Sequence, residues 1–201
     1  MRAFPIARAL LALLVLPVLG PLTASASSTS TPAASPVAFE ESWLDHQLTS
    51  WNTPGMAIPA APPAGGELDP RCTERERPAE TAEDEALVSA GWRLFLPYQR
   101  GWGVTLVWGL SGYDGMCRPM GYQIFVFVDG AFAGTMSPEP MNSRFDSAAD
   151  TANLWFRDQL SAEFRRYTAN DPLCCPSGSV SVDYTIEETP DGPVVNPVSA
   201  A

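Results

Sequence analysis

Four cysteines are the residues with the clearest chemistry in this chain of 201 residues. Cys174 and Cys175 are adjacent within the stretch DPLCCPSGS, and Cys72 and Cys117 precede them. Neighbouring side chains in an extended segment point to opposite sides, so each of the adjacent pair should reach a different distant partner. We therefore expect two long-range disulfides that join Cys72 and Cys117 to the 174–175 corner. A bond between the two neighbours, with a second bond between Cys72 and Cys117, is the alternative, and a redox role is another.

Metal and acid–base chemistry find little support in the sequence. A zinc site needs cysteine pairs separated by about two to four residues, or several histidines, and the chain has neither, so we expect no cofactor. His46, the single histidine, stands beside Asp45 and could serve a nucleophile, but a lone histidine is more often a solvated surface residue. The stretch GLSGYDG, residues 109–115, lacks the final glycine of a nucleophile elbow. Scattered acids could supply a carboxylate pair for glycoside hydrolysis, and they include Asp114, Asp129 and Asp183. We assign no catalytic residue and keep a secreted hydrolase as an alternative.

Aromatic side chains are concentrated between residues 92 and 122. If they faced solvent they could stack on sugar rings, but their strict alternation favours a buried core. The candidates for a ligand-binding platform are Trp92, Tyr98, Trp102 and Tyr113. A carbohydrate-binding module is therefore a second alternative.

Period-two patterns define the elements that would position these residues. In WGVTLVWGL, residues 102–110, large side chains alternate with small ones, which indicates a strand with one buried side. Tyr122–Val128 is apolar on both faces, and Asp129-Gly130 is the dipeptide of a type I′ hairpin. Further strands are expected from Leu160 and over residues 179–187, followed by a turn at Asp191-Gly192.

Helices are expected in three places. Residues 39–51 carry apolar side chains at helical spacing, Thr81 can cap a helix over residues 82–90, and residues 147–159 can form a third helix. The expected fold class is therefore α+β: a mostly antiparallel sheet of roughly five or six strands with two or three short helices, stapled by disulfides.

The start of the chain resembles a secretory signal peptide. Arg2 and Arg8 precede an apolar run from Ala9 to Leu19, and Ala24-Ser25-Ala26 is a cleavage signal. We expect residues 1–26 to be removed, residues 27–38 to form a disordered linker, and residues 39–201 to form one domain with a Pro/Gly-rich loop at 52–71. The product would be secreted or periplasmic, soluble, and not inserted in a membrane. The net charge of −11 argues against a nucleic-acid partner, because phosphate binding needs clustered cations.

Two segments resemble a known family. GYQIFVFVDGAFAGTMS, followed by RRYTANDPLCCPSGSVSVDYTIE, is similar to the LppP/LprE group of bacterial envelope lipoproteins. The resemblance covers roughly residues 85–190 and implies an envelope location, while the activity of that family is not established. No cysteine lies near the cleavage signal, so we expect a protein without a lipid anchor. We expect a non-catalytic envelope protein with a binding or structural role, and an envelope polysaccharide or protein as its partner. Protease inhibition through the loop at 52–71 is a further hypothesis.

Overall fold

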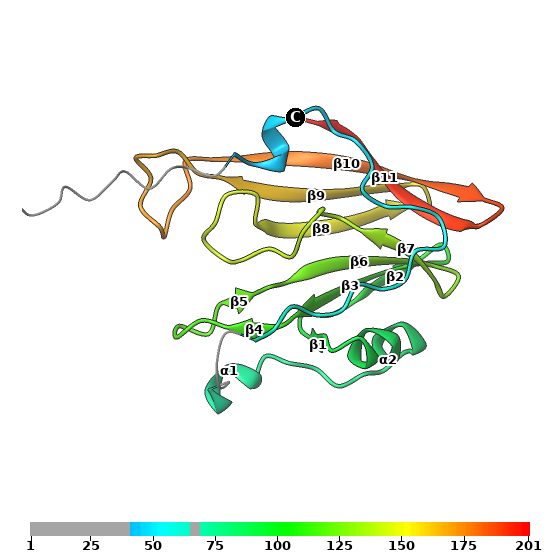
Figure 1. Cartoon of the computed structure of the whole chain (residues 1–201), viewed down its shortest axis with the longest axis horizontal. Helices are drawn as coiled ribbons and strands as arrows, with labels where there is room; N and C mark the ends of the chain where they lie inside the picture. Colours follow the sequence, from blue (N-terminus) through cyan, green and yellow to red (C-terminus); the bar gives the residue numbers. More distant parts are fainter. Residues whose placement is uncertain (1–40, 65–68) are drawn as a thin grey trace, which may run out of the picture. The chain divides into compact units, whose positions relative to one another are not determined.

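Strands dominate the computed structural model, which describes residues 41–64 and 69–201 (Figure 1). The first sheet contains β1 (Arg93–Leu94), β2 (Gln99–Gly101), β3 (Val104–Leu110), β6 (Gln123–Val128) and β7 (Ala131–Thr135). The second sheet has the order β11–β10–β9–β8 and contains β8 (Ala149–Phe156), β9 (Gln159–Arg166), β10 (Gly178–Thr189) and β11 (Gly192–Ala200). A small hairpin pairs β4 (Gly112–Tyr113) with β5 (Pro119–Met120). All strand pairs are antiparallel.

The expected α+β class is wrong, because the described part of the chain is mostly β. Its helical segments are a 3₁₀ turn, η1 (Trp43–Asp45), one turn of α1 (Pro70–Thr73), and α2 (Ala82–Ser89). The strands number 11, in place of the five or six expected. The signal peptide and linker predictions fall on residues outside those that the structure describes.

The helix expected over residues 147–159 is instead β8 and the start of β9. Two bulges interrupt the pairing of β8 with β9, one at Ala149/Thr151 and one at Leu154/Phe156. A bulge inserts a residue and breaks strict alternation. The buried residues Ala149 and Ala152 are consequently three positions apart, and this spacing imitates a helical face.

Two local predictions are confirmed. Asp129 and Gly130 have φ values of 48° and 84°, as a type I′ turn between β6 and β7 requires. The Thr81 hydroxyl accepts a hydrogen bond from the backbone N–H of Asp84 at 3.2 Å and caps α2.

The main core lies between the two sheets, and a smaller one covers the outer face of the first sheet. All seven residues of β3 are buried, although its sequence indicated one buried side. The smaller core explains the difference, because α2 packs over that face. Gly109 makes this packing possible: a Cβ there would come within 3.2 Å of Trp92 Cβ and 3.0 Å of Phe125 Cε2.

Two carboxamide side chains join the sheets where their edges meet. At one edge, Gln99 of β2 donates from Nε2 to the Ala152 carbonyl at 2.6 Å and accepts from the Leu154 N–H at 3.1 Å, both on β8. At the other edge, Asn52 donates from Nδ2 to the carbonyls of Thr135 on β7 and Val195 on β11, at 3.0 and 2.8 Å. Each amide thus takes the place of a peptide group between strands that are not paired directly.

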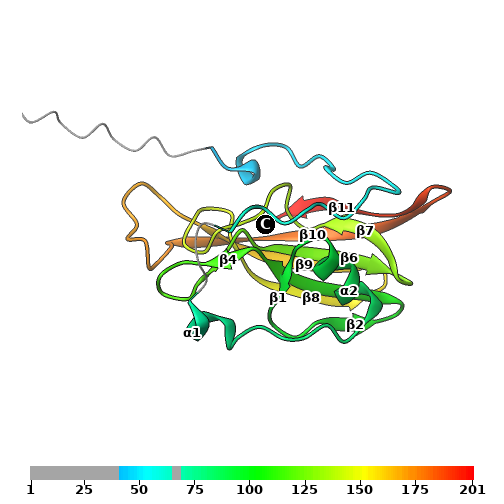
Figure 2. The same cartoon turned by 60° about the horizontal axis from the view of Figure 1, so that its bottom comes forward.

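Residues 41–64 form a strap along the second of these edges. Figures 1 and 2 both show this cyan segment passing beside β11 and β7. The expected helix over residues 39–51 is wrong apart from η1, yet its apolar side chains do pack on the main core. Trp43 lies edge-on to Phe164 at 5.1 Å between ring centroids, and the Trp51 indole donates to the Thr135 carbonyl at 3.0 Å.

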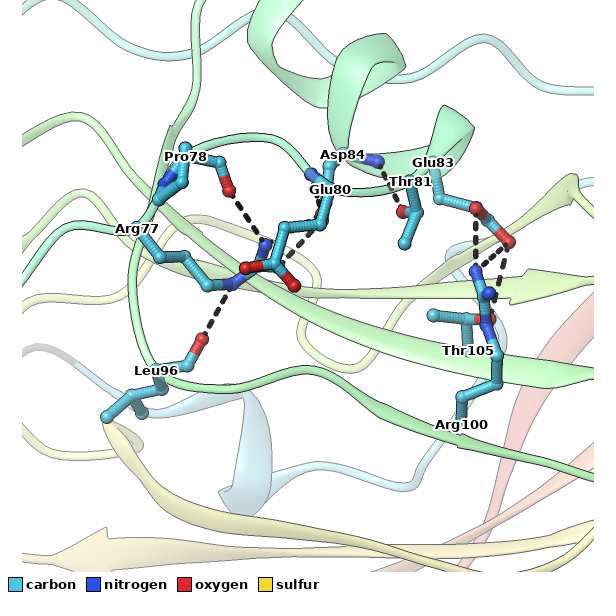
Figure 3. A network of polar contacts seen from close by, with 9 residues as sticks. All are labelled: Arg77, Pro78, Glu80, Thr81, Glu83, Asp84, Leu96, Arg100 and Thr105. Carbon is cyan, nitrogen blue, oxygen red and sulfur yellow. Dashed lines mark hydrogen bonds and ion pairs between the residues drawn. The ribbon is translucent and has the colours of Figure 1, made fainter.

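Ion pairs fasten α2 to the first sheet (Figure 3). Arg77 donates to both oxygens of Asp84 at 2.7 Å, and Arg100 donates to both oxygens of Glu83 at 2.9 Å. The Asp84 side chain is fully buried. Burial alone would raise the pKa of Asp84, but hydrogen bonds from Arg77 and from the Glu80 N–H hold it below the usual 3.8.

Candidate binding site

The cysteines pair differently from the favoured prediction. Cys72 bonds to Cys117, with 4.8 Å between their Cα atoms, and Cys174 bonds to its neighbour Cys175. The predicted long-range pairing is therefore wrong, and the alternative is the one found. The expectation assumed an extended segment, but residues 171–177 form a turn. In it the Cys175 N–H donates to the Pro172 carbonyl at 2.9 Å.

A cavity of about 440 Å³ lies beside the adjacent cysteines. Four segments contribute to it: the β4–β5 turn, the β7–β8 loop, the paired strands β8 and β9, and the β9–β10 loop. Its lining residues are Arg118, Pro119, Ser143, Arg144, Asp150, Arg165, Cys174 and Pro176. Figure 1 shows the β9–β10 loop in orange at the left, near the end where β4 and β5 lie.

Three guanidinium groups and one carboxylate line this cavity. Arg165 is paired with Asp150, and hydrogen bonding to that carboxylate raises the pKa of Arg165. Arg118 donates from Nε to Asp114 at 2.6 Å, which lies outside the lining. Arg144 has no hydrogen-bonding or ion-pair partner among residues 41–64 and 69–201. The pocket therefore carries excess positive charge in a chain whose net charge is −11.

The backbone around Arg144 is held in place by neighbouring segments. The Ser143 N–H donates to the Pro119 carbonyl at 3.1 Å, and Asn142 Oδ1 accepts from the Gly121 N–H at 2.7 Å. Arg144 itself has a φ of 71°, in the left-handed region that costs a non-glycine residue about 1–2 kcal/mol. Such strain is found where the surrounding structure fixes a residue for function.

The four aromatic candidates do not form one platform. Trp92 is buried in the smaller core, and Tyr98 lies between the guanidinium groups of Arg77 and Arg100, 5.1 and 5.5 Å from its ring centroid. Tyr113 is half-buried, and burial raises the pKa of its hydroxyl to about 12. Trp102 alone of the four is exposed, at 57 %. The strict alternation thus did indicate a core, with Trp102 as the exception.

The candidates for hydrolysis lie far apart or are already engaged. The exposed His46 is 3.9 Å from Glu41, while its neighbour Asp45 pairs with Arg166. Asp114 pairs with Arg118, whereas Asp129 belongs to the β6–β7 turn and Asp183 to β10. The structure therefore brings together neither a histidine with a nucleophile nor the carboxylate pair considered from these acids. The Pro/Gly-rich loop, where described, packs against the domain: Asn52 is buried, and the Pro59 carbonyl accepts from the Trp92 indole at 2.7 Å.

The pocket arginines escaped sequence reasoning because they are far apart in the chain. Arg118, Arg144 and Arg165 belong to three separate segments, and only Arg165 has a basic neighbour in sequence. One property of the sequence could have drawn attention to these arginines. Basic residues are scarce in the chain, which contains 12 arginines and no lysine.

Long apolar helices and clusters of metal-binding side chains are both missing from the described residues. None of their helices has both the length and the apolar character needed to cross a membrane. No three or more of their His, Cys, Asp and Glu side chains are grouped so that they could hold a metal ion.

Comparison with known proteins identifies one relationship. Residues 104–189 match the family model described as LppP/LprE lipoprotein, which confirms the resemblance seen in the sequence. The matched segment runs from β3 into β10 and contains every residue that lines the pocket. Neither the curated proteins nor the solved structures contain a match to the chain.

Proposed function

Because residues 104–189 belong to the LppP/LprE lipoprotein family, which implies a cell-envelope location, we propose that this protein is an exported envelope protein that binds an anionic ligand. The binding site is the pocket around Arg118, Arg144 and Arg165. The role is non-catalytic, and the product of export is soluble and located outside the cytoplasm.

One observation carries this proposal: Arg144, which has no carboxylate partner in the described part of the chain, lines a pocket together with two other arginines. The planar guanidinium group binds carboxylate and phosphate oxygens through two parallel hydrogen bonds. Arg118 and Arg165 are engaged by carboxylates and so hold fixed positions, while Arg144 can neutralise the ligand. Pro119, Pro176 and Cys174 supply an apolar wall, so the ligand combines an acidic group with a less polar body.

The remaining charge of the protein limits the size of the ligand. With a net charge of −11, the surface outside the pocket repels polyanions. The ligand class that fits is a small molecule, or a single residue of an envelope polymer, with one carboxylate or phosphate group.

Titration calorimetry at low ionic strength tests this proposal, with inorganic phosphate and acetate as anionic probes and acetamide as the neutral one. We expect both anions to bind, acetamide not to bind, and added salt to weaken the anion affinity. Arg144→Gln should weaken it at least tenfold, because a hydrogen bond to a charged group contributes about 1.5–3 kcal/mol.

Arg157→Gln is the matched control. Arg157 is also partly exposed, but it lies in the β8–β9 turn, at the end of the hairpin away from Arg165. It should leave anion binding unchanged. Equal affinities in wild type and Arg144→Gln, or acetamide binding as tightly as acetate, would refute the proposal.

A further inference from the structure

A second cluster gathers at the opposite end of the strands, where four hairpin turns meet around Arg157. Its guanidinium group donates to the Trp102 carbonyl at 3.0 Å, to Asp129 Oδ2 at 2.9 Å and to Glu188 Oε1 at 2.6 Å. These residues belong to the β2–β3 turn, the β6–β7 turn and the end of β10, while Arg157 stands in the β8–β9 turn. In Figure 1 the β10–β11 turn lies at the right, away from the orange β9–β10 loop.

Two large aromatic rings are exposed within this cluster. Trp102 and Phe156 lie 5.6 Å apart between ring centroids, tilted by 49°, and are 57 % and 55 % exposed. Phe156 is adjacent to Arg157 in sequence, so the rings lie next to the ion pairs. The rings touch each other but leave more than half of their surface uncovered.

The residue type at position 102 is costly for folding. Trp102 has a φ of 51° and Gly103 a φ of 78°, a conformation for which Asn-Gly is the preferred sequence. A bulky residue is strained there, and its exposed ring gains little from burial. The φ of Gly103 favours glycine, and a Cβ there would lie 2.4 Å from Asp129 Oδ1 and 2.5 Å from Arg157 Nη1, so both side chains would have to move. An exposed tryptophan in a strained turn indicates a role other than folding.

The charged groups around the rings are suited to hydroxyl groups. One guanidinium group serves two carboxylates, so the cluster has one excess negative charge. Glu188 binds Arg157 through Oε1, and its Oε2 has no hydrogen-bond donor in the described part of the chain. Exposed carboxylate oxygens accept hydrogen bonds from neutral hydroxyl groups and repel anions.

We propose that Trp102 and Phe156, with Asp129 and Glu188, form a binding site for a neutral pyranose polysaccharide. The Trp102 ring stacks on the C–H face of a sugar residue, and the carboxylates accept hydrogen bonds from its hydroxyl groups. The local negative charge distinguishes this ligand from an anionic membrane surface, which exposed aromatic side chains alone would also suit.

Affinity electrophoresis and titration calorimetry with soluble glucan, mannan, galactan and chitin oligosaccharides test the proposal. We expect at least one of the four to bind and to shift the tryptophan fluorescence to shorter wavelength. Trp102→Ala should weaken that binding at least tenfold, and its unfolding midpoint should change little, because the exposed indole ring gains little from burial.

Trp155→Ala is the matched control: Trp155 is 56 % exposed, but its indole bonds to Ser161 and its ring takes no part in the Trp102–Phe156 pair. It should leave sugar affinity unchanged, as should Arg144→Gln. The double variant Asp129→Asn, Glu188→Gln should weaken sugar binding while it keeps both rings.

Three results would overturn this site. The first is that none of the four glycans binds, and the second is equal affinity in wild type and Trp102→Ala. The third is binding to phosphatidylcholine or phosphatidylglycerol vesicles, lost in Trp102→Ala, without binding to any glycan, which would make the cluster a membrane contact.

Discussion

A single carboxamide joins the two sheets at one edge, where Asn52 bonds to Thr135 and Val195. It accepts from the Thr135 N–H at 2.9 Å as well as donating to two carbonyls. Gly134 of β7 cannot be replaced by a larger residue while Asn52 keeps its position, because a Cβ there would lie 2.3 Å from Asn52 Cγ. The side chain and the glycine are therefore required together.

Asn52→Ala should lower the free energy of unfolding by about 2–4 kcal/mol, because it leaves buried backbone groups of β7 and β11 without partners. Urea unfolding measures this as a lower midpoint with an unchanged slope. Asn196→Ala is the control, since that amide bonds only to the exposed Glu187, and it should change stability by less than about 0.5 kcal/mol. Equal losses in the two variants would show that the bridge contributes nothing.

Helix α2 is an element whose attachment depends on charge. Its first turn places Glu83 and Asp84 opposite Arg100 and Arg77, and Asp84 is buried with its pKa held low. A carboxylate with a folded-state pKa below its unfolded-state value stabilises the fold above the unfolded-state value. That stability is lost as the pH falls through the folded-state pKa.

The free energy of unfolding should therefore fall as the pH is lowered past about 4, near the unfolded-state value for aspartate. Asp84→Asn should make this dependence shallower and should lower stability at pH 7 by about 1.5–3 kcal/mol, because the hydrogen bonds from the half-buried Arg77 lose their charged acceptor. Unfolding curves between pH 7 and pH 2 measure both effects. The exposed Asp158→Asn should keep the wild-type profile, and an equally steep profile in Asp84→Asn would contradict the assignment.

At the scale of single elements, local sequence signals predicted local structure correctly. Features that depend on contacts between distant segments could not be predicted from the sequence. Asp129-Gly130 and the Thr81 cap act through their own backbone, so hairpin and helix followed directly. The pattern of β8 was misread because its bulges, which give a strand helical spacing, depend on pairing with β9. The pocket arginines come together only when three distant segments fold, and the spacing of these residues in the sequence does not encode that.

At the scale of the whole molecule, the two disulfides should differ greatly in their effect on stability. Cys72 and Cys117 are 45 positions apart, so their bond restricts the unfolded chain strongly, whereas the bond between neighbours restricts almost nothing. The two pairs thus offer an internal comparison of loop length.

Replacing Cys72 and Cys117 together by serine should lower the free energy of unfolding by about 4 kcal/mol, by the loop-entropy relation. The same change at Cys174 and Cys175 should lower it by less than about 1 kcal/mol. Denaturant unfolding of the two double variants, with a peptide map under non-reducing conditions, tests the pairing and its effect. Peptides that link residue 72 or 117 to the 174–175 pair would disprove the connectivity.

The joining of the sheets by side-chain amides has a consequence for the lifetime of the protein. Asparagine is among the thermolabile residues, and its hydrolysis replaces the amide donor with a carboxylate. At position 52 that carboxylate would face the carbonyl oxygens of Thr135 and Val195, so attraction would become repulsion. Deamidation of this one residue would then weaken the junction between the two sheets beside the strap. A continuous ladder of backbone hydrogen bonds would not be open to this kind of chemical damage.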